Sequence, residues 1–149
     1  MKKALLLLLT ILTLGFVTAP LSAQDTLTVA DGTETNSFVP FYGLYLDEVQ
    51  HTQVIYPADM LTDMQGSSII QMDFYMNASS SFTSTITISL GISDDATFSG
   101  TSFDETTTLT QVYSGPIVIA DNVFTVELEV PFSYTGGNLL FDFTNTGGI

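Results

Sequence analysis

The chain has 149 residues, of which 16 are Asp or Glu and only two are Lys, with no Arg, one His and no Cys. A formal net charge of −14 repels phosphate groups, so the composition excludes nucleic acid as a partner. The lack of Cys excludes a disulfide framework and, with a single His, argues against a zinc site.

The segment Met1–Ala23 has the pattern of a cleavable secretory signal peptide. Lys2 and Lys3 form a positive start, residues 4–14 form an apolar run rich in Leu, and Ala23 is a small residue of the kind found at cleavage sites. The apolar run is shorter than the roughly 20 residues that a membrane-spanning helix needs. We therefore expect cleavage after Ala23, no membrane insertion afterwards, and a protein that is secreted or held at the cell surface.

Cleavage at this point would remove both Lys residues and leave every acidic residue. The mature chain, residues 24–149, would then have a side-chain charge of about −16. Such a surface attracts divalent cations and is repelled by anionic membranes. We expect no salt bridges in the mature chain, so burial and backbone hydrogen bonds must stabilise it.

Alternation of apolar and polar residues predicts strands along most of the mature chain. In chain order the predicted strands are Thr26–Ala30, Phe38–Tyr45, Val49–Tyr56, Ile70–Met76, Thr85–Ile92, Leu109–Tyr113, Phe124–Phe132 and Asn138–Phe143. One helical turn is predicted at Pro57–Met64, because Pro opens it and Asp residues flank Leu61. Turn signals separate the segments, among them Asp31-Gly32, Gly66-Ser67, Ser114-Gly115-Pro116, Asp121-Asn122 and Thr135-Gly136-Gly137.

Regular strand spacing without a long helix predicts an all-β fold. We expect one antiparallel β-sandwich of the jelly-roll type over residues 24–149. The chain stops soon after the predicted core strand Asn138–Phe143, and Gly147-Gly148 is more typical of a turn than of an end. The sequence therefore favours a fragment whose domain lacks its last strands.

Candidate catalytic residues are few. His51 is the only His and no Gly-x-Ser-x-Gly elbow occurs, so we expect a solvated or hydrogen-bonded strand histidine. Glu127 and Glu129 have the spacing of paired glycosidase carboxylates, which on a strand puts them on one face about 6.8 Å apart. Their neighbours on that face are Thr125 and Pro131 rather than aromatic rings, so we interpret them as a solvated strand face.

We expect no cofactor and interpret the acidic loops as ordinary solvated turns, with calcium, which prefers several oxygen ligands, as the alternative. The candidate ligands bracket a loop-rich stretch and are Asp94, Asp95, Asp104 and Glu105. Aromatic residues give a second candidate site. Tyr42, Tyr45 and Tyr56 are interpreted either as a sugar-stacking platform or, because alternation turns about half of them inward, as core residues.

Three stretches are distinctive together: Thr28–Tyr45, Gln53–Leu61 and Tyr134–Leu140. They resemble the N-terminal module of large secreted proteins of Bacteroidetes, which often continue into fibronectin type III or adhesin-like domains and a type IX secretion sorting domain. The resemblance covers nearly all of residues 25–142 and brings no catalytic residues. It implies a non-enzymatic adhesion or interaction role, with a protein or glycan partner outside the cell. The alternative is a carbohydrate-binding accessory module of a secreted hydrolase.

Overall fold

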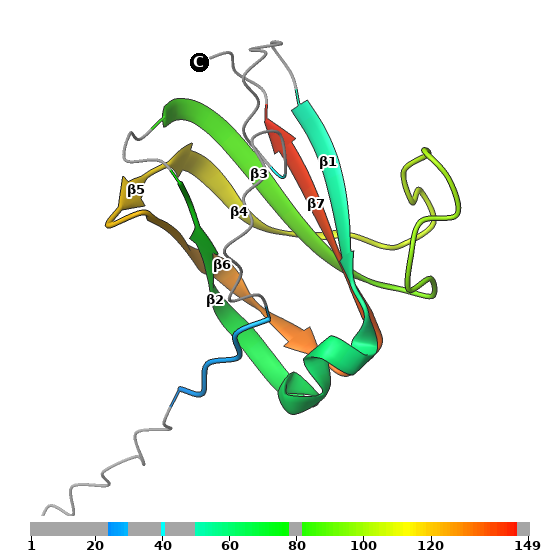
Figure 1. Ribbon diagram of the computed structural model, residues 1–149. Helices are drawn as coiled ribbons and strands as arrows, with labels where there is room; N and C mark the ends of the chain where they lie inside the picture. Colours follow the sequence, from blue (N-terminus) through cyan, green and yellow to red (C-terminus); the bar gives the residue numbers. More distant parts are fainter. Residues whose placement is uncertain (1–23, 30–39, 41–49, 78–81, 146–149) are drawn as a thin grey trace, which may run out of the picture.

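A computed structural model describes residues 24–29, 40, 50–77 and 82–145 (Figure 1). Strands dominate these residues, and the only helical element among them is one short 3-10 helix. The strands form two antiparallel sheets in a sandwich-like arrangement, which confirms the predicted all-β class. Among the described residues, no helix has the length and apolar character needed to cross a bilayer.

Most strands of the fold lie in the segments where the alternation of apolar and polar residues predicted them. The elements are β1 (Gln50–Tyr56), η1 (Ala58–Met64), β2 (Ser67–Tyr75), β3 (Phe82–Ser93), β4 (Thr110–Ile117), β5 (Ile119–Ala120), β6 (Val123–Tyr134) and β7 (Asn138–Asn145). One sheet has the order β1-β7-β3-β4 and the other the order β2-β6-β5. Strand β7 therefore lies between β1 and β3, and strands far apart in sequence are neighbours.

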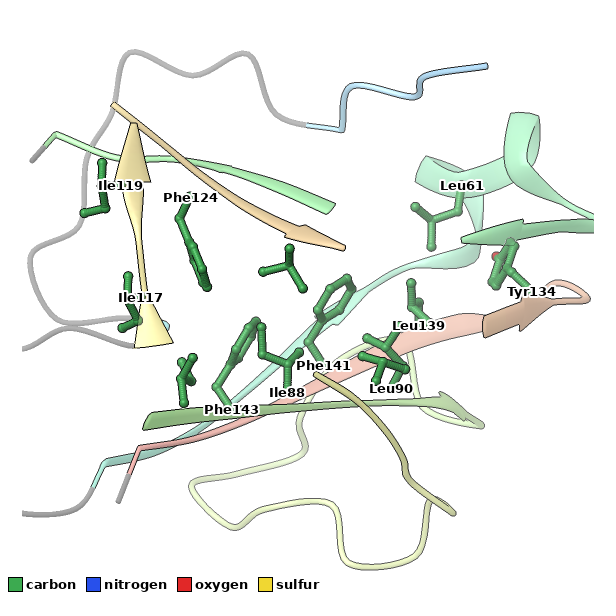
Figure 2. Packing of buried hydrophobic residues seen from close by; sticks show 13 residues of the cluster. Leu61, Ile88, Leu90, Ile117, Ile119, Phe124, Tyr134, Leu139, Phe141 and Phe143 are labelled. Atoms are coloured by element: carbon green, nitrogen blue, oxygen red, sulfur yellow. The ribbon is translucent and has the colours of Figure 1, made fainter. Parts of the chain in front are cut away.

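The hydrophobic core lies between the two sheets (Figure 2). In one sheet, β3 supplies the fully buried Ile88 and Leu90 and its neighbour β7 supplies Phe143. From the other sheet, β6 supplies facing side chains such as Phe124. The predicted helical turn is present as η1, and its Leu61 is buried and joins the same cluster. Burial of this extent stabilises a domain of this size without disulfides.

One predicted strand is wrong in its described part. Residues 24–29 form no strand, because no strand of the described residues pairs with them. Leu27 and Val29 instead pack against the core without belonging to a strand. The predicted strand Phe38–Tyr45 lies outside the described residues except for Pro40, which forms a bend.

A second difference concerns the predicted turn at 114–116, which lies inside β4. Strand β4 is at the edge of its sheet, where Pro116 is tolerated because an edge strand needs fewer backbone donors. The Tyr113 hydroxyl donates to the Pro116 carbonyl oxygen at 2.7 Å. The turn signal at Asp121-Asn122 is confirmed, because both residues have positive φ and join β5 to β6.

Candidate functional site

A long loop, residues 94–109, connects the antiparallel strands β3 and β4 (Figure 1). Antiparallel neighbours are more often joined by loops of about two to five residues, and long loops without secondary structure are usually functional. The four residues predicted as calcium ligands all lie in this loop. We call residues 94–109 the β3–β4 loop.

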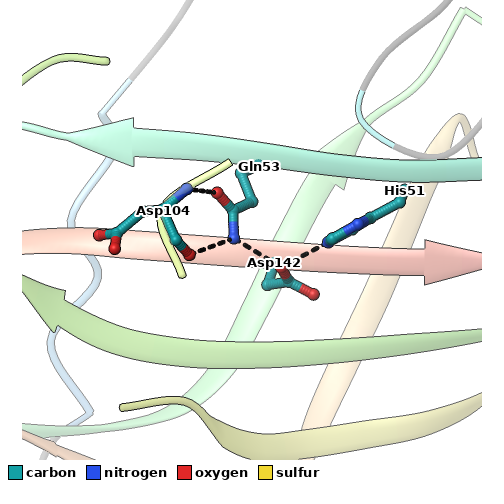
Figure 3. A network of polar contacts seen from close by, with 4 residues as sticks. All are labelled: His51, Gln53, Asp104 and Asp142. Carbon is teal, nitrogen blue, oxygen red and sulfur yellow. Dashed lines mark hydrogen bonds and ion pairs between the residues drawn. The ribbon is translucent and has the colours of Figure 1, made fainter. Parts of the chain in front are cut away.

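Gln53 on β1 fastens the β3–β4 loop to the sheet through the backbone of Asp104 (Figure 3). The Asp104 amide donates to Gln53 Oε1 at 2.7 Å, and Gln53 Nε2 donates to the Asp104 carbonyl oxygen at 3.1 Å. The side-chain amide thus pairs with one residue's backbone as a neighbouring strand would. Gln53 Nε2 also donates to Oδ2 of Asp142 on β7 at 2.8 Å, which links the loop to two strands.

The carboxylate of Asp104 is bound by donors of its own loop and of β3. Its Oδ2 accepts from Thr107 Oγ1 at 2.6 Å and from Ser93 Oγ at 3.0 Å. Its Oδ1 accepts from the amides of Thr106 and Thr107 and from Thr106 Oγ1. Hydrogen bonds from Thr107, then Thr106, hold the pKa of Asp104 well below its ordinary value of 3.8, because they stabilise the ionised form.

His51 lies two residues before Gln53 on the same face of β1. Its Nε2 is 2.7 Å from Oδ2 of the buried Asp142 (Figure 3), which confirms the predicted hydrogen-bonded strand histidine. The expectation that the mature chain forms no salt bridge is wrong, because a protonated His51 makes an ion pair with Asp142. The imidazole also stacks on Phe103 of the β3–β4 loop, with ring centroids 4.0 Å apart and an interplanar angle of 24°.

The β3–β4 loop presents apolar side chains to solvent as well as carboxylates. Phe98 is 36% exposed and Phe103 is 46% exposed, although one face of the Phe103 ring rests on His51. Asp94, Asp95 and Glu105 are also exposed. Within the described part of the chain, no three acidic or His side chains are gathered in an arrangement that could hold a metal ion.

The predicted aromatic platform is only partly within the described residues. Tyr42 and Tyr45 lie outside them. Tyr56 packs edge-to-face on Phe141, with ring centroids 5.2 Å apart, and belongs to the core boundary. Burial raises the pKa of its hydroxyl. Phe103, rather than Tyr56, has an exposed aromatic ring next to a polar side chain of a strand, and the sequence analysis did not name Phe103 as a candidate.

The two carboxylates with glycosidase spacing lie on β6, where Glu127 is exposed and Glu129 has a partner on β4. The amide of Ser114 on β4 donates to Glu129 Oε1 at 3.3 Å, and Glu127 lies across from Gln71 of β2. In the part of the chain that the structure describes, no Ser or Thr hydroxyl is hydrogen-bonded to His51. The His51–Asp142 pair therefore lacks, among these residues, the nucleophile that a catalytic triad needs.

Comparison with known proteins identifies no relative. No family model, no curated protein and no solved structure matches the chain. Function is therefore argued from the chain's own residues and their geometry.

Proposed function

We propose that the chain is a non-enzymatic module of a secreted or cell-surface bacterial protein and acts in adhesion or interaction through the β3–β4 loop. The observation that carries this proposal is the exposed Phe103 ring on a loop that Asp104 and Gln53 fasten to the sheet. An anchored loop loses little conformational entropy when it binds a partner. Exposed aromatic rings are also the side chains that most often contribute strongly to binding.

The chemistry of the partner is limited by charge. Residues 24–149 contain no Lys or Arg, and the β3–β4 loop adds the exposed carboxylates of Asp94, Asp95 and Glu105 to its aromatic rings. Anionic partners would be repelled from this surface, whereas neutral or cationic ones would not. A protein or a neutral glycan outside the cell fits these conditions.

Two features of the sequence support the proposed location and role. The segment Met1–Ala23 has the pattern of an export signal. The resemblance of Thr28–Tyr45 and Gln53–Leu61 to modules of secreted Bacteroidetes proteins agrees with an adhesion role. Neither feature selects the partner.

The alternative is a carbohydrate-binding accessory module of a secreted hydrolase, and the Phe103 ring also favours it. One ring face stacks on His51, and almost half of the side chain stays accessible to solvent. An aromatic ring held rigidly in this way offers a flat apolar surface to a sugar ring. The hydrogen bonds of Gln53 and Asp142 keep the strand face beneath it polar.

Binding measurements with two aromatic variants would test both readings. The purified domain would be applied to a glycan array and to an array of extracellular matrix proteins. We expect Phe103→Ala to weaken any specific binding by about tenfold or more, because central aromatic contacts contribute most of the affinity. Tyr75→Ala is the matched control, since Tyr75 is 71% exposed on β2 in the other sheet.

The outcomes separate the two candidates. Saturable binding to a matrix protein that depends on Phe103 supports the interaction module, whereas saturable binding to one polysaccharide supports the carbohydrate-binding module. Equal binding by Phe103→Ala and Tyr75→Ala would remove the β3–β4 loop as the binding surface. Absence of specific binding on both arrays would contradict both candidates.

A further inference from the structure

The β3–β4 loop is held on the sheet by two contacts of different chemistry. The first joins the Gln53 side chain to the backbone of Asp104, and the second is the stack of Phe103 on His51, with ring centroids 4.0 Å apart. The groups of the first contact carry no charge at any ordinary pH. Imidazole, in contrast, is the side chain that ordinarily gains and loses a charge between about pH 5 and 8. The second contact can therefore change with pH while the first stays the same.

The hydrogen bonds of Asp142 define where His51 takes up a proton (Figure 3). An ionised carboxylate only accepts hydrogen bonds, and Oδ2 of Asp142 lies 2.7 Å from His51 Nε2 and 2.8 Å from Gln53 Nε2. Nε2 of His51 therefore already carries a hydrogen in the neutral ring, and protonation takes place at Nδ1. Because both charge states keep the hydrogen bond to Asp142, protonation adds charge to the ring without breaking this bond.

Protonation of His51 adds attraction on both described sides of the ring. On β7, the hydrogen bond to the buried Asp142 becomes an ion pair. In the β3–β4 loop, the π face of Phe103 attracts a cation that lies against it. On β1 the one other titratable group is Tyr56, which stays neutral because burial raises its pKa. The titratable groups of the loop are all carboxyls, which are ordinarily anions above about pH 5: Asp94, Asp95, Asp104 and Glu105.

We infer that the stack of Phe103 on His51 makes the β3–β4 loop pH-sensitive, so that Phe103 is held more rigidly at about pH 5.5 than at about pH 8. As a regulation of binding, this rests on the function proposed above for the same loop, whereas the response of the loop to pH needs no partner. The chain has one His and no Cys, so no other side chain ordinarily titrates in this range. A partner that binds through Phe103 is then retained better in mildly acidic surroundings, because a rigid ring loses less entropy on binding.

A fluorescent ring in place of Phe103 tests the contact directly. The chain contains no Trp, so Phe103→Trp introduces a single indole against His51. A protonated imidazole quenches an indole that it touches, because it accepts an electron from the excited state, whereas a neutral imidazole quenches little. We expect the emission of the full chain to fall by about half as the pH is lowered from about 8 to about 5, along the curve of one titrating group.

Two matched variants show whether the fall comes from the stack. Phe98→Trp places the fluorophore in the same loop at an exposed ring that does not stack on His51. Phe103→Trp combined with His51→Gln keeps an amide donor for Asp142 but has no group there that can be protonated. We expect nearly constant emission over the same pH range in both. An equal fall in all three proteins would overturn the inference.

Hydrogen exchange measures how firmly the loop is held when Phe103 is unchanged. The amides of Asp104, Thr106 and Thr107 are hydrogen-bonded, so they exchange when the loop opens. We expect His51→Gln to speed their exchange about two- to fivefold near pH 5.5, the effect of losing one cation–π contact, and by less near pH 8. Comparing the two proteins at the same pH removes the intrinsic pH dependence of exchange.

The outcomes keep this inference apart from the function on which it rests. Emission of Phe103→Trp that does not respond to pH, or equal acceleration of exchange by His51→Gln at both pH values, overturns the pH-sensitive loop and leaves the proposed binding role to the array measurements. Arrays that show no binding through Phe103 overturn the regulation of binding together with the proposed function, even where the loop itself responds to pH.

Discussion

Asp104 is the residue at which the β3–β4 loop, β1 and β3 meet. Its backbone pairs with Gln53, and its carboxylate accepts from Ser93, Thr106 and Thr107. Hydrogen bonds to a carboxylate are stronger than neutral ones, and they favour its ionised form. Asp104 therefore stabilises the loop most strongly while it is ionised.

This gives the first prediction at the residue scale, a pH-dependent contribution from Asp104. Its pKa is lower in the folded chain than in the unfolded chain, so its stabilisation is present above the unfolded value, near 3.8, and is lost as the pH falls through the folded value. Asp104→Asn cannot titrate. We expect the difference in unfolding free energy between wild type and Asp104→Asn to be largest near neutral pH and to shrink steadily below about pH 4.

Urea denaturation of both proteins at a series of pH values measures this difference. Asp94→Asn is the matched control, since it removes a carboxylate from the same loop whose side chain has no hydrogen bond to the described residues. For the control, the difference from wild type should not shrink in the same way. A constant difference for Asp104→Asn down to pH 2 would mean that the hydrogen bonds at Asp104 do not stabilise the folded state.

Part of this arrangement was accessible from the sequence. Asp104 was singled out, but as a calcium ligand. Thr106 and Thr107, two and three residues later, are a local signal for an Asp side chain that accepts from following amides. The pairing with Gln53 has no local signal, because the two residues are far apart in sequence and meet only through the sheet. The stacking of Phe103 on His51 is hidden for the same reason.

At the scale of elements, Gly91 explains how closely the β3–β4 loop lies on β3. A Cβ at Gly91 would be 2.5 Å from Thr107 Cγ2 and 2.7 Å from the Thr108 carbonyl oxygen. Real side-chain carbons do not approach other atoms this closely, so the loop can occupy its position only above a Gly. Gly100 is in the same loop, and a Cβ there would have no atom within 4 Å.

The second prediction compares these two glycines. We expect Gly91→Ala to displace the loop and to lower the unfolding free energy by about 1–3 kcal/mol, as overpacking does elsewhere. Gly100→Ala should stay within about 0.5 kcal/mol of wild type. Urea denaturation measures both values, and hydrogen exchange of residues 94–109 shows whether the loop has moved. Equal stability and equal exchange in the two variants would contradict close packing of the loop on β3.

The positions of most strands were predictable from the sequence, because each strand is determined by the alternation of apolar and polar residues within its own segment. Alternation over Thr85–Ile92 and Phe124–Phe132 reflects one buried and one wet face, and the structure places strands there. The neighbours of each strand were not predictable, since pairing β7 with both β1 and β3 joins distant segments. Thr26–Ala30 shows the limit of the pattern: Leu27 and Val29 alternate and face the core, yet residues 26–29 have no ladder partner among the described strands.

At the scale of the whole molecule, charge dominates the surface. After Ala23 the chain has 16 acidic side chains and one His. Repulsion among like charges destabilises a compact state, and the single His51–Asp142 pair offsets little of it. The core between the sheets must outweigh this repulsion.

The third prediction concerns ionic strength. We expect the melting temperature of a protein made of residues 24–149 to rise as NaCl increases from about 20 mM to about 0.5 M, because salt screens repulsion between exposed charges. Thermal scans by circular dichroism measure the change. Sucrose at matched osmolality is the control for solute exclusion. An equal rise in sucrose, or a fall in NaCl, would show that repulsion does not limit the stability of this fold.

The position of β7 has a consequence for biogenesis. Gln50 at the start of β1 pairs with Asn145 at the end of β7, so β1 waits for a partner that is synthesised almost a hundred residues later. Such long-range pairing makes folding slow, because the chain between β1 and β7 must lose conformational entropy before the two strands can form their stabilising contacts. A nascent chain with this topology cannot complete the β1-β7-β3-β4 sheet until β7 has been synthesised, so its fold is assembled only at the end of translation.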